Sequence, residues 1–374
     1  MARPDLTFSQ TTAQTFFNFA RKWLTISSLA TVPVTFLVNA PFGRFTPSGD
    51  SIFLVDGIKS WILMELVSPI MFTYCFFKSP LSYYRPALPA PISPQAILAA
   101  CFLIHYANRA IISPLRTPRR SKSHIIVPMS AVGFNLLNGS MMGSYLSSPF
   151  ARIFLTPDVT FARTSFWVGL LLWAVGFAGN IIHDEILLDI RRKAKVGKGK
   201  GKSKTEEDDG KKAKNGEKPS QERPKGEYYG IPQGWLYDYI SYPNYFCEWV
   251  EWFGFALAAS PLPFELPAVI TSLPSLLVNP IDFVLALGPV LPAALGGLWQ
   301  LLLFVLSPAF LQWIVNGINS PTYLWGQTLT PPHIFFMAEV ATMFPRAWNG
   351  HKWYKTTFKE SYPKDRKVVI PWIL

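Results

Sequence analysis

The feature that most constrains this chain is a series of apolar stretches, each near the length that crosses a bilayer. They cover roughly residues 23–40, 53–77, 96–115, 125–146, 166–192, 243–259 and 333–344. A helix of about 20 apolar residues spans the hydrocarbon core of a membrane. The chain shows no strand pattern, and 49% of its residues are hydrophobic. We therefore expect an all-α polytopic bundle of about seven transmembrane helices.

The positive charge predicts orientation in the membrane and gives no sign of a nucleic-acid partner. Of the net charge of +12, eight units lie in residues 191–225, which contain 14 Lys/Arg and 6 Asp/Glu among many Gly and Ser residues. Such a composition is typical of a disordered, solvated segment. Basic clusters also follow the third span and end the chain. The positive-inside rule places all of them in the cytosol, with the N-terminus lumenal and the C-terminus cytosolic.

The domain organisation follows from these stretches. The N-terminal residues lack the pattern of a cleaved signal, so the first apolar run is expected to remain as an anchor. We predict one membrane domain over residues 1–374, interrupted by a disordered basic cytosolic loop at 193–225 and a Pro-rich apolar insertion at 261–332. The insertion is either interfacial and re-entrant or contains two further spans. The three cysteines, which lack metal or redox spacing, are expected to be free thiols.

Polar residues inside the apolar runs mark the candidate site. Glu65 lies within the second run, and Tyr106 lies on the third, beside His105 and Arg109. Ionisable residues inside membrane spans usually face a cavity or a partner. The alternative for each acid is a place in headgroup water at a helix end, and for Tyr106 an interfacial anchor.

Two further polar stripes follow from helical spacing. Asn180, Asp184 and Arg191 fall within roughly 40° of one another around a helix. In the sixth run, Asn244, Glu248 and Glu251 share one face at i, i+4 and i+7. Small and amide residues of the fourth run, from Asn135 to Gly143, suit close helix packing.

Several common cofactor and catalytic motifs are missing from the sequence. It contains no GxGxxG or P-loop in a suitable context, no HExxH and no plausible Ser-His-Asp arrangement. No metal site is expected. Any nucleotide would have to be held by a helical bundle with polar residues facing inward and arginines at its cytosolic mouth.

Four separated motifs resemble the steroid 5α-reductase family, in the order found there. They are LIHYANRAIISPL, GNIIHDEILLDIRR, YGIPQGWLYDYISYPNYFCEWVEWFGFALA and RAWNGHKWYKTTFKESYPKDRKVVIPWIL. The resemblance implies a multi-pass enzyme of the endoplasmic reticulum membrane that uses NADPH to reduce a carbon–carbon double bond conjugated to a ketone. It also implies a lipid substrate that enters from the bilayer. We expect a monomer surrounded by membrane lipids.

The resemblance also assigns roles to residues of this chain. Tyr106 and Glu65 match the pair that binds the substrate carbonyl oxygen, Tyr106 as the donor and Glu65 hydrogen-bonded to it. The positions matched to the cofactor are Arg120, Asn180, Asp184, Arg191, Tyr229, Asn244, Glu248, His351 and Tyr354. The chain departs from the family at Asn349 and Gly350, where members often carry consecutive histidines, and at Gly230, where some carry Arg.

Other readings remain open from the sequence. Relatives within the family reduce polyprenols or very-long-chain enoyl-CoA. A membrane methyltransferase for prenyl-cysteine or phospholipid would bind S-adenosylmethionine and would not need Tyr106 and Glu65. A non-catalytic scaffold would leave the intramembrane acids unexplained.

Overall fold

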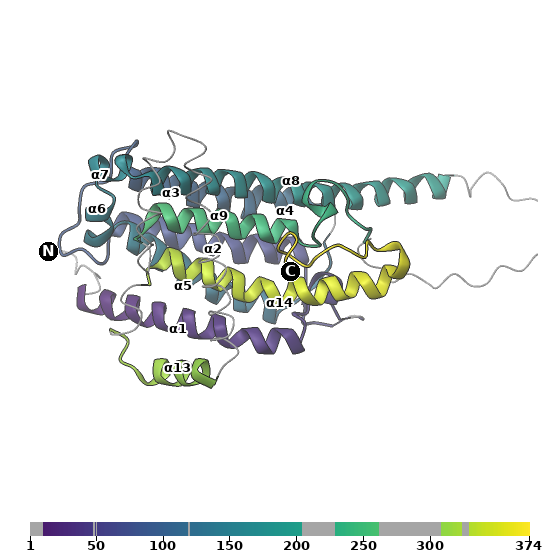
Figure 1. Ribbon diagram of the computed structural model, residues 1–374, viewed down its shortest axis with the longest axis horizontal. Coiled ribbons are helices and arrows are strands. Elements are labelled where there is room, and N and C mark those ends of the chain that lie inside the picture. Colours follow the sequence, from purple (N-terminus) through teal and green to yellow (C-terminus); the bar gives the residue numbers. More distant parts are fainter. Residues whose placement is uncertain are drawn as a thin grey trace, which may run out of the picture.

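The fold is a bundle of long helices that lie side by side along one axis (Figure 1). The computed structural model describes residues 10–47, 49, 51–118, 120–203, 229–261, 308–323 and 329–374. The longer helices are α1 (Gln10–Leu37), α2 (Gly57–Lys78), α3 (Pro94–Tyr106), α5 (Ile126–Leu146), α8 (Thr164–Ser203), α9 (Pro243–Ala259), α13 (Pro308–Asn319) and α14 (Pro331–Phe358). Shorter pieces are α4 (Ser113–Arg116), α6 (Pro149–Phe154), α7 (Pro157–Ala162), η1 (Gly43–Phe45), η2 (Ala107–Ile112), η3 (Trp235–Asp238) and η4 (Lys359–Ser361).

Membrane character is evident in the described helices. Three helical stretches among them are long and apolar enough to cross a bilayer, Gly57–Lys78, Pro94–Arg116 and Thr164–Lys193. The second of these is α3, η2 and α4 running on without a break. The predicted all-helical membrane class is thus supported, while the count of seven spans and the orientation of the termini stay predictions.

Close helix packing depends on residues without side chains. A Cβ atom built on Gly139 or Gly143 of α5 would lie 2.2 or 2.3 Å from a backbone oxygen of α2. One built on Gly176 of α8 would lie 2.4 Å from the backbone nitrogen of Glu251 in α9. Glycines allow this approach because they carry no Cβ. The packing role predicted for the fourth run is confirmed at the contact between α2 and α5, and a glycine of α8 allows the same close approach to α9.

Several predicted boundaries need correction. α1 begins at Gln10, well before the apolar run, because Arg21 and Lys22 donate to backbone carbonyls of Leu329, Ile318 and Ser320 and so are satisfied within the protein. α14 continues to Phe358, beyond the predicted end near residue 344. One pair of two-residue antiparallel strands, β1 (Leu54–Val55) and β2 (Ser123–His124), occurs where no strand was expected.

The two predicted interruptions are only partly described. α8 continues as a helix to Ser203 and so includes residues 193–203 of the loop that was predicted to be disordered. Residues 204–225 of that loop lie outside the described part of the chain. In the insertion at 261–332, α13 lies beside α1 at the periphery of the bundle (Figure 1). Most of the remaining insertion also lies outside the described residues, so its topology stays a prediction.

Candidate active site

A cavity of about 450 Å³ lies at one end of the bundle, among α2, α8, α9, α14 and the η1 and η3 segments. Its volume falls within the range of small-molecule sites, roughly 300–1,000 Å³. Six residues assigned to a cofactor from the sequence line it together, Arg120, Asp184, Arg191, Tyr229, Asn244 and Tyr354. Segments separated by more than 200 residues thus contribute to one wall.

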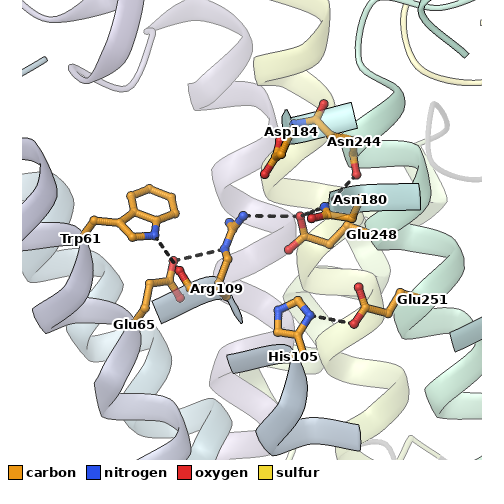
Figure 2. Close-up of polar contacts among 9 residues, drawn as sticks. All are labelled: Trp61, Glu65, His105, Arg109, Asn180, Asp184, Asn244, Glu248 and Glu251. Carbon is orange, nitrogen blue, oxygen red and sulfur yellow. Dashed lines mark hydrogen bonds and ion pairs between the residues drawn. The ribbon is translucent and has the colours of Figure 1, made fainter. Parts of the chain in front are cut away.

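The wall formed by α8 and α9 is fixed by hydrogen bonds between the two polar stripes. Asn180 Nδ2 donates to Glu248 Oε2 and to the carbonyl oxygen of Asn244, both at 3.1 Å. Asn244 Nδ2 donates to Asp184 Oδ1 at 3.0 Å. Figure 2 shows these four side chains stacked along the two helices. Asn180 and Glu248 lie behind the cavity surface, so they orient the residues that form it.

Arg109 connects this wall to the predicted catalytic acid. Its guanidinium lies between two carboxylates, with Nε 3.5 Å from Glu65 Oε1 and Nη1 3.6 Å from Glu248 Oε2 (Figure 2). Arg109 belongs to η2, a π-helical turn that follows α3 directly. Such turns occur often at functional sites because the wider turn redirects side chains. Trp61 of α2 lies beneath the guanidinium, at 4.9 Å, and donates to the Arg109 carbonyl at 3.3 Å.

Tyr106 is enclosed by amide side chains. Its hydroxyl accepts a hydrogen bond from Asn138 Nδ2 at 3.1 Å and lies 3.5 Å from Asn135 Oδ1, and the residue is only 3% exposed. Glu65 pairs with Arg109, so the expected hydrogen bond between Glu65 and Tyr106 is replaced by these contacts. The correction has a simple cause, since a guanidinium is a stronger partner for a carboxylate than a phenol is.

The acid Glu251 belongs to a separate buried pair. His105 Nδ1 lies 2.7 Å from Glu251 Oε1, and the glutamate side chain is fully buried (Figure 2). The three residues of the sixth-run stripe therefore diverge in role. Asn244 lines the cavity, Glu248 lies behind its surface, and Glu251 pairs with His105 of α3.

His351 also proves to be a supporting residue. Its Nδ1 lies 2.6 Å from Ser241 Oγ, which in turn lies 2.6 Å from the hydroxyl of Tyr362. Ser241 lines the cavity and His351 does not. Burial raises the pKa of Tyr362, so this phenol remains a hydrogen-bond donor at neutral pH. The cluster connects α14, the η3 segment and the C-terminal tail behind the cavity wall.

The structure adds two arginines that sequence reasoning missed. Arg44 of η1 and Arg346 of α14 both line the cavity, and Nη1 of each is buried without a hydrogen-bond partner among the described residues. The Arg44 guanidinium lies within 5.0 Å of three aromatic ring centres, those of Tyr229, Trp353 and Tyr354. The signal available was a lone arginine in a glycine turn, PFGRF, and another at the end of an apolar run.

Arg192, unlike its neighbour Arg191, does not line the cavity. Its guanidinium pairs with Glu185 and, at 2.7 Å, with Asp189 on the same helix. Arg191 lines the cavity. Adjacent arginines of α8 thus face different surroundings because successive residues of a helix point about 100° apart.

Comparison with known proteins identifies a family model and relatives over most of the chain. The family model for 3-oxo-5-alpha-steroid 4-dehydrogenase matches residues 218–275 and 322–374. An uncharacterized protein of Schizosaccharomyces pombe is 30% identical over 371 residues, covering 96% of this chain and all of the relative.

Two relatives with functional names show similar coverage. The steroid 5-alpha-reductase DET2 of Gossypium hirsutum is 26% identical over 96% of this chain and 98% of its own length. The 3-oxo-5-alpha-steroid 4-dehydrogenase 1 of Rattus norvegicus is 26% identical over 90% of this chain and 87% of its own length. This chain therefore belongs to the steroid 5α-reductase (3-oxo-5α-steroid 4-dehydrogenase) family of oxidoreductases.

Proposed function

We propose that this protein uses NADPH to reduce the carbon–carbon double bond conjugated to a ketone in a membrane lipid, with a 3-oxo-4-ene steroid as the substrate type. The observation that carries the proposal is the placement of Tyr106. Its phenol is buried within a helical stretch long and apolar enough to cross a membrane, and Arg109, three residues further along that stretch, lines the arginine-rich cavity. A polarising donor and an anion-binding cavity therefore lie next to each other.

The residues of the cavity fit a phosphorylated dinucleotide. In Arg44 and Arg346, the buried Nη1 has no hydrogen-bond partner among the described residues, and such guanidinium donors suit phosphate oxygens, which accept bidentate hydrogen bonds. Arg120 and Arg191 add positive charge on the same surface. A cofactor with a 2′-phosphate makes better use of four arginines than one without it, so we expect NADPH to be preferred to NADH.

The chain's own residues account for the remaining chemistry. When bound, the reduced cofactor supplies a hydride for the β-carbon of the enone. Negative charge then develops on the substrate carbonyl oxygen, and a donor fixed at that oxygen lowers the barrier. Tyr106 provides this O–H group, and Asn138 orients it by donating to the phenol oxygen. Glu65 pairs with Arg109, three residues after Tyr106, and so fixes a positive charge in the region where the negative charge would develop.

The cellular setting follows from the same proposal. A multi-pass protein of the endoplasmic reticulum membrane, with the cavity open to cytosolic NADPH, would take its lipid substrate directly from the bilayer. We propose that it acts as a monomer, since the described part of the chain contains every residue used in this mechanism. Family membership argues against the methyltransferase and scaffold readings.

The proposal is tested with membranes that contain the protein. They are incubated with NADPH and with a panel of 4-ene-3-keto steroids, polyprenols and enoyl-CoA thioesters, and products heavier by two hydrogens are identified by mass spectrometry. The steroid arm is expected to give product. Reduction confined to polyprenol or enoyl-CoA would reassign the substrate within the family, and no reduction in any arm would refute the proposed function.

A further inference from the structure

Glu339 is a carboxyl group of the cavity wall that the proposed chemistry has not used. It lies in the first half of α14, lines the cavity and is half-buried. Its carboxyl group forms no hydrogen bond or ion pair with any residue in the described part of the chain. The neighbouring acids Glu65, Glu248 and Asp184 all have such partners.

The packing of α9 against α14 fixes the depth of Glu339. The two helices run antiparallel, since Tyr242 clusters with Ala347 at one end and Trp252 contacts Phe335 further along, with ring centres 4.5 Å apart. One helical turn from that contact, toward the cavity, lies Glu339 on α14 and Glu248 on α9. Residues four apart share a helix face. The two glutamates therefore lie at the same depth on facing helices.

This position brings Glu339 into electrostatic range of the reacting groups. It interacts with Glu248, Arg109 and Glu65, and also with Tyr106. Arg109 already pairs with Glu65 and Glu248. A third carboxylate beside one guanidinium would leave two uncompensated negative charges in a low-dielectric site, which is costly. A protonated carboxyl group at Glu339 avoids that cost.

The proposed reaction consumes a proton, and the groups around Tyr106 do not supply it. Reduction of an enone consumes one hydride and one proton. The hydroxyl of Tyr106 contacts the amide groups of Asn135 and Asn138, which carry no titratable proton. Glu65 is held by Arg109 as an ion pair. Glu339, by contrast, lines the cavity, where water can reach it, and also interacts electrostatically with Tyr106.

We propose that Glu339 is the proton donor that completes the reduction, an inference that rests on the proposed function. After hydride reaches the β-carbon, the O–H bond of Glu339 breaks and its proton joins the α-carbon of the enolate. The electron pair of the enolate C=C bond forms the new C–H bond, and the ketone is restored. Glu339 is left as a carboxylate beside Arg109, and it regains a proton from water when the cavity opens for cofactor exchange.

The test compares Glu339→Gln with Glu360→Gln, a control at an acid exposed beyond the bundle and paired only with Lys364. Single-turnover reduction should fall about 10²- to 10³-fold in Glu339→Gln and stay unchanged in the control, since general acid catalysis contributes factors of this size. NADPH affinity, measured by fluorescence titration, should change less than about twofold, a margin well under the tenfold that 1.4 kcal/mol represents. Glu339→Asp, which keeps the acid, should restore part of the rate.

A second readout does not depend on turnover. The infrared spectrum of the wild-type protein should contain a carbonyl stretch of a protonated carboxylic acid that shifts in D₂O and is missing from Glu339→Gln. Full reduction rates in Glu339→Gln beside an active wild type would overturn the inference and leave the proposed function standing, and so would an unchanged infrared band. A wild-type protein that reduces no substrate would instead refute the proposed function itself.

Discussion

Replacing Tyr106 with Phe removes one hydroxyl from the centre of the proposed mechanism. The aromatic ring keeps its contacts with Phe102 and His105, whose ring centres lie 4.8 and 5.2 Å away. The loss leaves Asn138 Nδ2 with Ser68 Oγ at 3.4 Å as its remaining partner. A buried donor left poorly satisfied costs about 1–3 kcal/mol of stability. The folded protein should therefore persist with a lowered Tm.

The effect of Tyr106→Phe on the reaction rate should be larger than its effect on stability, and the two can be measured separately. Loss of one hydrogen-bond donor to a developing oxyanion costs about 10² to 10³ in rate, or roughly 2.7–4 kcal/mol of transition-state stabilisation. The rate constant for reduction, measured by NADPH oxidation in single-turnover experiments, should fall by that factor. NADPH affinity should barely change, because Tyr106 does not line the cofactor cavity.

Tyr145→Phe provides the matched control. Tyr145 is likewise 3% exposed, and its hydroxyl donates to the Ala259 carbonyl at 3.0 Å, away from the cavity. It should lose a similar amount of stability and little activity. Wild-type rates in Tyr106→Phe, or equal losses of rate in the two variants, would refute the assignment of Tyr106 as the donor.

Three further predictions concern the cofactor end and the loop. Arg346→Gln removes a guanidinium whose buried Nη1 has no partner among the described residues, and it should weaken NADPH binding about 10- to 100-fold, since a charge-assisted hydrogen bond contributes about 1.5–3 kcal/mol. Arg192→Gln should leave the measured Kd unchanged because that side chain is paired on its own helix. Gly350→Ala would place a Cβ 1.6 Å from the hydroxyl of Tyr242, and this overpacking should cost about 1–3 kcal/mol, seen as a lower Tm. Deletion of residues 204–225 should retain most reductase activity, and its loss in a correctly inserted protein would show that the loop contributes to the site.

The apolar runs and the spacing of the polar residues within them were sufficient to predict which helix faces contribute to the site. Asp184 and Asn244 could be placed on inward faces from spacing alone, because helical periodicity fixes which residues share a face. The hydrogen bond that joins them across α8 and α9 agrees with that placement. The glycines of α5 were equally informative, since the lack of a side chain has one main use between membrane helices.

The pairing of charged groups could not be deduced in this way. The family resemblance paired Glu65 with Tyr106, yet in the structure Glu65 pairs with Arg109. Which partner a carboxylate takes depends on distances between helices that are remote in sequence, and periodicity within one helix carries no such information. The same reason explains why His351 was expected at the cofactor and lies behind Ser241 instead.

The sequence by itself determined the class of this protein, a helical membrane bundle with acids and arginines in its spans, because a bilayer accepts few backbone arrangements and makes each buried charge conspicuous. The tertiary structure decided which of those charges meet. It brought Arg44, Arg346 and Glu339 to one cavity from segments about 300 residues apart. The packing of α14 against α1 and α9, together with the turn at η1, creates that proximity, and it leaves no periodic trace in the chain.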